Sequence, residues 1–304
     1  MVAWEGRFQQ SRSMNDTFYK SLFLIDCETL AGQLDDPGLK IFDCTQRLVR
    51  DPKLYVRAES CKTEYAEAHI PGAGYLDILA ELSDRSKRWR YMMPAVDVLA
   101  GAFAKRGIGK DTRVVLYDTD GMMWSTRVWW QLHAIGFDNA AVLDGGLGHW
   151  RALGHPVSDA PCAYVETDSV PVGEARNLLV DHKAVLDALE VRNTAVVNAL
   201  TREQFCGGGI TYGRPGRISG SVNVPARELT DKGTGTLKPA AELQRLFDDA
   251  GVDLAGPVLC YCGGGIAATL DAFVLTLLGA EDVTVYDASM QEWALDDNLP
   301  METG

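Results

Sequence analysis

An internal repeat is the feature that most restricts how this 304-residue chain can fold. One amphipathic helix is expected to end at Gly107 and another at Gly251, and each glycine stands where a helix C-cap would lie. The next expected strand ends eleven positions later in both copies, at Asp118 and at Cys262, so the copies are offset by 144 residues. A constant offset between similar segments is typical of a duplicated structural unit.

The repeat continues beyond these strands with a slightly smaller offset. The following helices are expected to close at Gly136 and Gly279, and the similar runs 143–150 and 286–293 come after them at an offset of 143. One residue is therefore missing from the second copy, and the glycines after Cys262 are the natural place for the deletion.

Each copy alternates expected strands with expected helices, which predicts an α/β fold. Two domains are indicated, each a parallel-rich sheet flanked by helices on both faces, with right-handed connections between parallel strands. Buried strands are expected at 39–43 and 194–198. The predicted division is an N-terminal extension at 1–22, a first domain at 23–155, a linker at 156–176 and a second domain at 177–304.

Cys262 is followed by three glycines and stands between an expected strand, beginning at Val258, and an expected helix over 266–278. Glycines have no Cβ, so their N–H groups can turn inward and join those of the helix N-terminus as a cradle for an anion. A cysteine at the rim of such a cradle is favoured as a thiolate and can act as a nucleophile. The backbone groups of the predicted cradle belong to Gly263, Gly264, Gly265, Ile266 and Ala267.

The composition excludes several classes of partner. A net charge of −13 argues against nucleic acid, because a nucleic-acid binder needs a basic surface. No apolar run approaches the roughly 20 residues that span a bilayer, and the polar start of the chain, with Glu5 and Asp16, does not resemble a secretory signal. Seven scattered cysteines without zinc-like spacing indicate reduced thiols, so we expect a cytoplasmic protein without a metal or other cofactor.

Several further motifs occur in one order along the chain. Those of the first half are His69–Ala73 with Asp77, Val115–Asp118, Arg127–Trp130, and Leu143–Gly146 with Trp150. Those of the second half are Gly220–Pro225, Cys262, and Tyr286–Asp287 with Trp293. Together they resemble the tandem-domain rhodaneses, the thiosulfate and mercaptopyruvate sulfurtransferases, from about Phe23 to the end of the chain. The resemblance implies an inactive first domain, with Asp118 at the position equivalent to Cys262, and a catalytic second domain.

The resemblance also implies a reaction. Cys262 would take a sulfane sulfur from a small donor, thiosulfate or 3-mercaptopyruvate, and pass it as a persulfide to cyanide or a thiol, or to an acceptor protein. The thiolate and the persulfide are both anions, which the inward N–H groups from Gly263 to Ala267 and the helix dipole would stabilise.

The residues that mark the donor within the family are replaced here. Relatives that prefer thiosulfate have basic residues where this chain has Gly263 and Gly264. Relatives that prefer mercaptopyruvate have a loop serine in place of Gly264 and an arginine where Cys206 is found, and a first-domain acid and histidine in place of Leu79 and Tyr91. The donor therefore stays open, and basic side chains elsewhere are expected to recruit it. The candidates are Arg214, Arg202, Arg217 and Arg85, with Arg88 and Arg90 near the expected interdomain cleft.

Two other functions fit the same cysteine. A cysteine phosphatase needs an arginine six positions after the nucleophile, where this chain has Ala268, so that function is disfavoured. A non-catalytic persulfide carrier or redox-sensing module acting on a protein partner would use a thiol pair, Cys260 with Cys262 or Cys262 with Cys206. Cys260 can equally be a packed core thiol and Cys206 a small filler, so the carrier function stays as the alternative.

Overall fold

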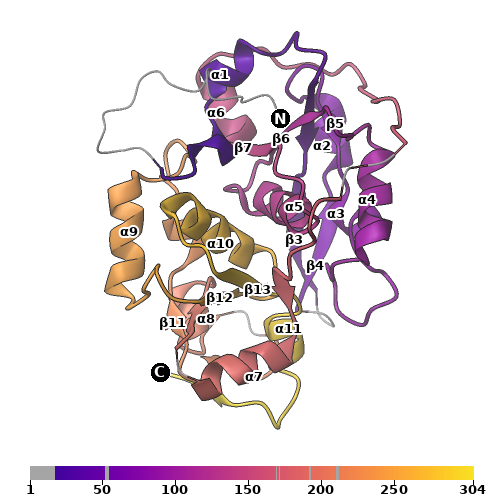
Figure 1. Ribbon diagram of the computed structural model, residues 1–304. Helices are drawn as coiled ribbons and strands as arrows, with labels where there is room; N and C mark the ends of the chain where they lie inside the picture. The colour runs from indigo at the N-terminus through magenta and orange to yellow at the C-terminus, as the bar shows by residue number, and fades with distance from the viewer. Residues whose placement is uncertain (1–17, 52–54, 169, 171, 192, 210–211) are drawn as a thin grey trace.

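The computed structural model describes residues 18–51, 55–168, 170, 172–191, 193–209 and 212–304, which form two α/β units (Figure 1). The sheet of the first unit has the parallel order β1-β7-β6-β2-β5, and that of the second has the parallel order β8-β13-β12-β9-β11. The strands of the first sheet are β1 (Leu24–Ile25), β2 (Leu39–Asp43), β5 (Gly74–Tyr75), β6 (Arg113–Tyr117) and β7 (Ala140–Leu143). Those of the second are β8 (Leu179–Val180), β9 (Ala195–Asn198), β11 (Val222–Asn223), β12 (Val258–Tyr261) and β13 (Val283–Tyr286). Corresponding strands take the same places, which confirms the predicted α/β class and the duplication.

Helices cover both faces of each sheet, as predicted. The helices of the first unit are α1 (Cys27–Ala31), α2 (Lys62–Glu67), α3 (Ile78–Glu81), α4 (Val96–Ala104), α5 (Met123–Ala134) and α6 (Gly146–Ala152). Those of the second are α7 (His182–Val191), α8 (Arg202–Phe205), α9 (Ala240–Asp249), α10 (Ala267–Leu278) and α11 (Met290–Trp293), and the 3₁₀ turns are η1 (Ser21–Phe23) and η2 (Ala226–Glu228).

Alternate residues of each strand enter different hydrophobic cores, as the two-residue period of a strand requires. In the first sheet, Val115 packs with α1 and α6, whereas Val114 packs with α4 and α5. In the second sheet, Leu259 packs with α7 and α11, whereas Val258 and Cys260 pack with α9 and α10. The core around α5 and α10 is continuous between the units, so both domains share one buried interior.

Two antiparallel pairs were not expected from the sequence. One is the hairpin of β3 (Gln46–Asp51) and β4 (Tyr55–Ser60), which follows β2 in the first unit. The other joins β10 (Arg217–Ile218) to β14 (Met301–Glu302) near the C-terminus. The hairpin matters for function because its first strand reaches the second domain's pocket, as described below.

The two domains meet through equivalent surfaces. Helix α5 packs against α10, and the hydroxyls of Thr126 and Thr269, which the repeat relates by its offset of 143, lie 3.2 Å apart. Two further hydrogen bonds are equivalent under the repeat, since Leu237 corresponds to Met93 and Asp287 to Asp144. Met93 N donates to Asp287 Oδ2 at 2.7 Å, and Leu237 N donates to Asp144 Oδ1 at 2.7 Å. The interface therefore has the reciprocal pattern of a two-fold dimer within a single chain.

The described ends of the predicted extension and linker pack on the domains. Phe18 is buried and Lys20 N donates to Leu277 O at 3.2 Å, so this part of the extension lies along α10, while residues 1–17 fall outside the described residues. In the linker, Ser158 N bonds to His69 O at 2.8 Å and Gly173 N to Ile135 O at 3.1 Å. Within the described residues, no helix is long and apolar enough to cross a bilayer.

Candidate active site

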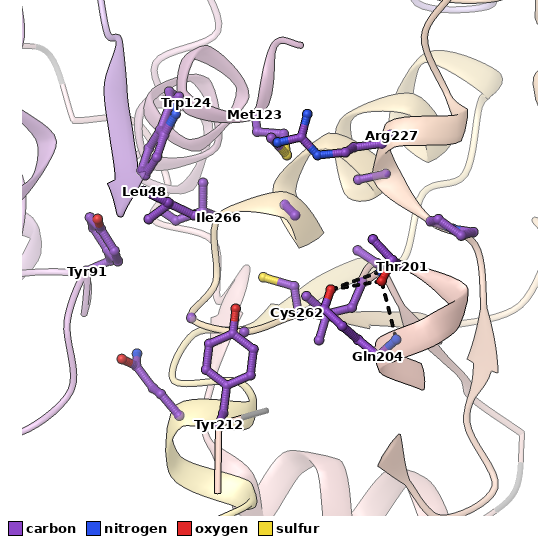
Figure 2. Close-up of a pocket in the computed structure, with 18 of the residues that line it drawn as sticks. Leu48, Tyr91, Met123, Trp124, Thr201, Gln204, Tyr212, Arg227, Cys262 and Ile266 are labelled. Carbon is purple, nitrogen blue, oxygen red and sulfur yellow. Dashed lines mark hydrogen bonds between the residues drawn. The ribbon is translucent and has the colours of Figure 1, made fainter. Parts of the chain in front are cut away.

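Cys262 lies directly after β12, at the carboxyl end of the second sheet and just before α10, as predicted. Its side chain is 2% exposed, and in Figure 2 its sulfur points into a pocket of 260 Å³. The Cys262 N–H donates to Ser289 Oγ at 3.1 Å and the Cys262 carbonyl accepts from Met290 N at 3.0 Å. These bonds hold the cysteine backbone from the loop before α11.

The loop after Cys262 needs its glycines. A Cβ on Gly263 would lie 2.0 Å from the Tyr212 hydroxyl, and one on Gly265, where φ is +74°, would lie 2.4 Å from Asp287 O. Within the described part of the chain, the N–H groups of the four residues 263–266 have no hydrogen-bond acceptor. The loop is thus tightly packed from outside and leaves unused donors beside the cysteine, as an anion cradle requires.

The corresponding loop of the first domain already holds an anion. Asp118 stands where the repeat places the equivalent of Cys262, and its carboxylate is 2% exposed. It accepts hydrogen bonds from the backbone N–H groups of Asp120 (2.8 Å), Met122 (3.0 Å), Trp124 (3.0 Å) and Ser125 (2.8 Å). Burial raises the pKa of Asp118, and the bonds from Ser125 and Asp120 oppose that rise. The Ser125 hydroxyl also donates to Asp118 Oδ2, at 2.8 Å. This loop geometry can therefore bind a negative charge through four backbone donors and one hydroxyl.

Both domains line the pocket around Cys262, mostly with apolar and aromatic side chains. The first domain contributes Leu48, Val49, Arg90, Tyr91, Met123 and Trp124. Of the described residues that line the pocket, Arg90 and Arg227 are the charged ones. The guanidinium of Arg227 also pairs with Asp120 of the first domain, 3.2 Å between Nη2 and Oδ1.

Two tyrosines bring phenol groups to this pocket. The ring of Tyr212 lies against Gly263, and Figure 2 shows its hydroxyl directed into the pocket on the side of Cys262. Burial and the nearby Cys262 charge raise the pKa of Tyr212, so it is a neutral hydrogen-bond donor at neutral pH. Tyr91, whose pKa is also raised by burial, has a buried hydroxyl without a partner among the described residues. Tyr212 was not selected from the sequence, because only its packing against Gly263 reveals it.

The four predicted substrate arginines lie outside the lining of the Cys262 pocket, and their role in substrate binding stays a prediction. Arg214 donates to the carbonyls of Leu299 and Trp293, both at 3.0 Å, and so fastens the segment after α11. Arg217 pairs with Glu302 at 3.0 Å, Arg202 lies 5.7 Å from the Phe205 ring, and Arg85 is exposed. None of the four lines the pocket. The basic groups that do so are Arg90, a weaker candidate in the sequence, and Arg227, which the sequence analysis missed.

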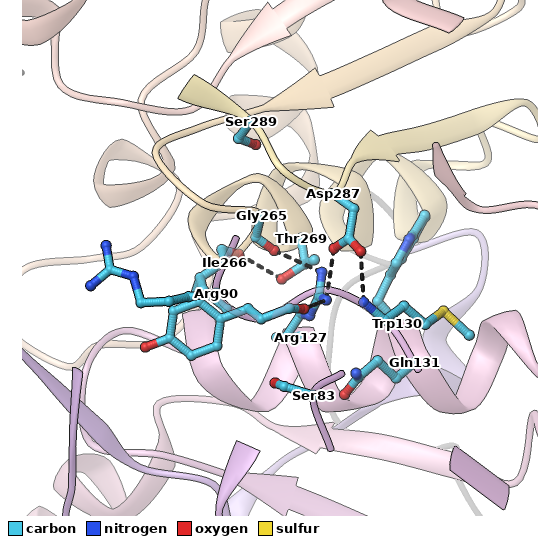
Figure 3. Close-up of polar contacts among 12 residues, drawn as sticks. Ser83, Arg90, Arg127, Trp130, Gln131, Gly265, Ile266, Thr269, Asp287 and Ser289 are labelled. Atoms are coloured by element: carbon cyan, nitrogen blue, oxygen red, sulfur yellow. Dashed lines mark hydrogen bonds and ion pairs between the residues drawn. The ribbon is translucent and has the colours of Figure 1, made fainter. Parts of the chain in front are cut away.

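An arginine from the first domain holds the loop of the second. Arg127, on α5, is completely buried, and its Nη1 donates to Gly265 O at 3.1 Å while its Nη2 lies 2.8 Å from Asp287 Oδ1 (Figure 3). The same guanidinium also donates to the carbonyl of Tyr91. The planar fork of arginine suits such multiple contacts. Arg127 therefore joins the glycine loop, the loop after β13 and the first domain.

Ser289 has the backbone angles φ 53° and ψ −148°, a region that L-residues rarely adopt. The equivalent residue of the first domain is Gly146, with φ 56°. The Ser289 hydroxyl donates to Tyr286 O at 2.7 Å and accepts from Cys262 N. The second domain thus keeps a strained serine whose hydroxyl contacts the backbone of the cysteine.

The other thiols lie away from the pocket. All seven cysteines are free, Cys260 is completely buried in the core beside α10, and Cys206 is half-buried. Neither of these two lines the pocket with Cys262. Among the described residues, no three His, Cys, Asp or Glu side chains are arranged to hold a metal ion.

The fold and the site define a two-domain α/β protein that keeps one cysteine loop and has lost the other. The family model for the rhodanese-like domain matches residues 26–153 and 174–296, so this chain belongs to the rhodanese family. It is a rhodanese-family sulfurtransferase, an enzyme class that acts on small-molecule sulfur donors and acceptors.

The relatives carry two kinds of name. The rat 3-mercaptopyruvate sulfurtransferase is 33% identical over 287 residues, which cover 89% of this chain and 91% of the relative. The rat thiosulfate sulfurtransferase is 34% identical over 241 residues, which cover 76% of this chain and 79% of the relative. Overall identity therefore does not separate the two donors.

Solved structures agree with the fold. The crystal structure of a 3-mercaptopyruvate sulfotransferase from Escherichia coli has a TM-score of 0.78 at 27% identity, covering 88% of this chain and 98% of that one. An anaerobic ergothioneine biosynthesis enzyme from Chlorobium limicola has a TM-score of 0.80 at 20% identity, covering 94% and 71%. At that identity the second likeness concerns the fold alone.

Proposed function

We propose that this enzyme moves a sulfane sulfur from thiosulfate or 3-mercaptopyruvate to cyanide or a thiol through a persulfide on Cys262. The comparison of the two loops is the observation that carries the proposal. In the first domain four backbone N–H groups bind the Asp118 carboxylate, whereas in the second domain the loop donors beside Cys262 have no acceptor among the described residues. A persulfide anion on Cys262 supplies the negative charge that such donors stabilise.

The reaction has two displacements at sulfur. The Cys262 thiolate attacks the outer sulfur of thiosulfate or the thiol sulfur of 3-mercaptopyruvate, and a new S–S bond forms. The electron pair of the broken S–S or C–S bond leaves with sulfite or with the enolate of pyruvate, and the enolate takes up the proton of the donor thiol. The acceptor then attacks the outer sulfur of the persulfide, and the S–S electron pair returns to Cys262 as a thiolate. Each step conserves charge and requires no external oxidant or reductant.

We propose further that 3-mercaptopyruvate is the better donor. The pocket is lined mostly by apolar and aromatic groups, and Arg90 and Arg227 are its charged lining residues in the described structure. An organic monoanion buries its carbon skeleton against such walls and needs one guanidinium for its carboxylate. Thiosulfate, a dianion without apolar surface, gains less from the same pocket.

Mass measurement of the intact protein tests the persulfide. Incubation with 3-mercaptopyruvate should add one sulfur to the wild-type chain, which cyanide then removes, and Cys262→Ser protein should stay unmodified. Labelling of the Cys262→Ser protein would place the sulfur elsewhere and overturn the assignment. Stoichiometric loading without repeated turnover to cyanide would support the alternative, a persulfide carrier that discharges to a protein partner.

Steady-state kinetics test the donor. With cyanide as the common acceptor, kcat/KM for 3-mercaptopyruvate should exceed that for thiosulfate by about tenfold or more, the factor that one additional favourable contact provides. Equal or reversed values would contradict the preference while leaving the persulfide mechanism intact.

A further inference from the structure

A second pocket, of 510 Å³, lies at the carboxyl end of the first domain's sheet. Its walls come from the residues after β2, from α2, from Thr119 and Asp120 in the loop after β6, and from α6. This is the position at which parallel sheets bind ligands, and at which the second domain places its own pocket. Asp118 stands in the place of Cys262, so the cysteine loop is not repeated beside this pocket. The thiol that does line it, Cys61, is 6% exposed, and burial raises its pKa.

Charges of both signs line the first-domain pocket. The acidic residues on its walls are Asp43, Glu64, Glu67 and Asp120, and the basic ones are Arg47, Arg151 and Arg227. Two pairs neutralise each other, Arg47 with Glu64 at 2.9 Å and Arg227 with Asp120 at 3.2 Å. The charged groups left for a ligand are one guanidinium, Arg151, and two carboxylates, Asp43 and Glu67.

Arg151 and Asp43 differ in the hydrogen bonds that they already make within the protein. Arg151 donates one bond, from Nη2 to Ala68 O at 3.3 Å, and is otherwise exposed. Asp43 is 2% exposed and accepts from Thr45 N at 2.8 Å, and burial raises its pKa to about 6, so it is mainly ionised at neutral pH. A molecule with both a carboxylate and an ammonium group complements these side chains.

The first-domain pocket and the Cys262 pocket adjoin each other. Leu48, on the β3–β4 hairpin, and Arg227, on η2, line both. A molecule whose charged groups occupy the larger pocket can therefore extend past these two residues toward Cys262. The second substrate of the proposed reaction is the molecule that must bring a sulfur nucleophile to that point.

We infer that the first-domain pocket binds the sulfur acceptor, and that this acceptor is a zwitterionic peptide thiol with an ammonium and a carboxylate group. The inference rests on the proposed function. In the transfer, the acceptor thiol loses its proton to solvent and its sulfur attacks the outer sulfur of the Cys262 persulfide. The bond between that sulfur and Cys262 breaks, and the products are an acceptor persulfide and the Cys262 thiolate.

Acceptor kinetics test this assignment with cysteinylglycine, which has one ammonium and one carboxylate, as the zwitterionic thiol and 2-mercaptoethanol as the uncharged one. In Arg151→Gln and in Glu67→Gln, KM for cysteinylglycine should rise about tenfold, the loss expected for one charge-assisted contact. KM for 2-mercaptoethanol and for cyanide should stay unchanged. Arg245→Gln, which removes an exposed arginine from α9, is the matched control and should leave all three acceptors unaffected.

A binding measurement separates this inference from the proposed function. Calorimetry with S-methylcysteinylglycine, which cannot accept sulfur, on Cys262→Ser protein should give a Kd that Arg151→Gln weakens about tenfold. Absence of binding, or a KM for cysteinylglycine that is unchanged in both variants, overturns the acceptor site even if Cys262 loads with sulfur. Failure of Cys262 to load with any sulfane donor overturns the proposed function, and the acceptor role falls with it.

Discussion

At the scale of single residues, the proposed mechanism requires the sulfur of Cys262 to carry negative charge twice in each cycle. Backbone N–H groups are one source of stabilisation, and the neutral phenol of Tyr212 is another. The ring of Tyr212 also packs on Gly263, so its hydroxyl and its ring have separable roles.

Tyr212→Phe keeps the ring and removes the hydroxyl. We expect kcat/KM for the donor to fall about tenfold, because the pocket loses a hydrogen bond to the developing sulfur anion. The midpoint of thermal unfolding should change no more than it does for a typical surface substitution. Donor kinetics and thermal unfolding of the same preparations check both expectations. Tyr19→Phe, at an exposed tyrosine outside the pocket, is the control, and an unaltered rate in Tyr212→Phe would restrict Tyr212 to packing.

Substitutions at Ser289 can separate the effect of its backbone strain from the effect of its hydrogen bond with Cys262. Glycine tolerates φ 53° and alanine does not, but both lack the hydroxyl that accepts from Cys262 N. Ser289→Gly should therefore be about 1–3 kcal/mol more stable than Ser289→Ala, while the two variants lose donor kcat/KM to a similar extent. Urea unfolding and steady-state rates are the measurements. Equal stability of the two variants would show that the strain at this position has no energetic weight.

At the scale of the elements, the periodic parts of the fold could be predicted and the long-range contacts could not. The β12 strand, the glycine loop and α10 follow from local patterns, because apolar period and glycine content act within a few residues. The hairpin of β3 and β4 was missed. Its contact with the pocket of the second domain, through Leu48 and Val49, forms only in the folded chain.

The arginines show the same limit more clearly. Arg214 was a candidate because, of the basic residues, it best matches a substrate arginine of the family, yet its partners are carbonyls 79 and 85 residues away in the sequence. Arg227 was passed over, although η2 carries it to the junction of both pockets. Charged residues in loops do not recur at a regular spacing, so the sequence does not indicate which way their side chains face.

Helix α10 contains a carboxyl group whose burial costs free energy. Asp271 is completely buried, neither of its side-chain oxygens has a partner in the described structure, and burial raises its pKa well above the usual range. The folded state therefore binds a proton more tightly than the unfolded state does. This contribution to stability is fully present below the unfolded pKa and is lost as pH rises toward the folded pKa.

Asp271→Leu should remove both the pH dependence and the unpaired polar group. We expect the variant to be more stable than wild type by about 2 kcal/mol at pH 8, with a smaller gain at pH 4. Asp271→Asn is the matched control, because it removes the titration but keeps an unpaired polar group, and it should gain less. Urea midpoints across the pH range provide the comparison, and an equal gain for Leu at both pH values would contradict the titration of Asp271.

At the scale of the whole molecule, the domain interface is reciprocal in shape but not in chemistry. The threonine pair and the two aspartate contacts obey the repeat, whereas Arg127 does not, since the residue that the repeat places opposite it is the buried Leu270. The first domain thus supplies a completely buried guanidinium to the loop of the second, whereas the guanidinium that pairs with the loop of the first, Arg227 on Asp120, is exposed. The first domain, which has Asp118 in place of a cysteine, thus supports the loop of the second domain and lines its pocket.

Arg127→Lys tests this dependence between domains. Lysine keeps the charge near Asp287, but its single ammonium cannot also reproduce the planar contacts to Gly265 O and Tyr91 O. We expect donor kcat/KM to fall between about tenfold and a hundredfold, because the cradle loses its fixed geometry. The unfolding free energy should fall by only about 1–2 kcal/mol, since the buried charge keeps a partner.

Two comparisons make the Arg127→Lys experiment decisive. Arg106→Lys changes an arginine of a surface ion pair with Glu81 and should leave activity and stability nearly unchanged, because such pairs contribute little. A merely structural arginine would lower stability in parallel with activity. A large loss of activity in a stably folded Arg127→Lys protein would instead mean that the first domain positions the glycine loop of the second through a single buried side chain.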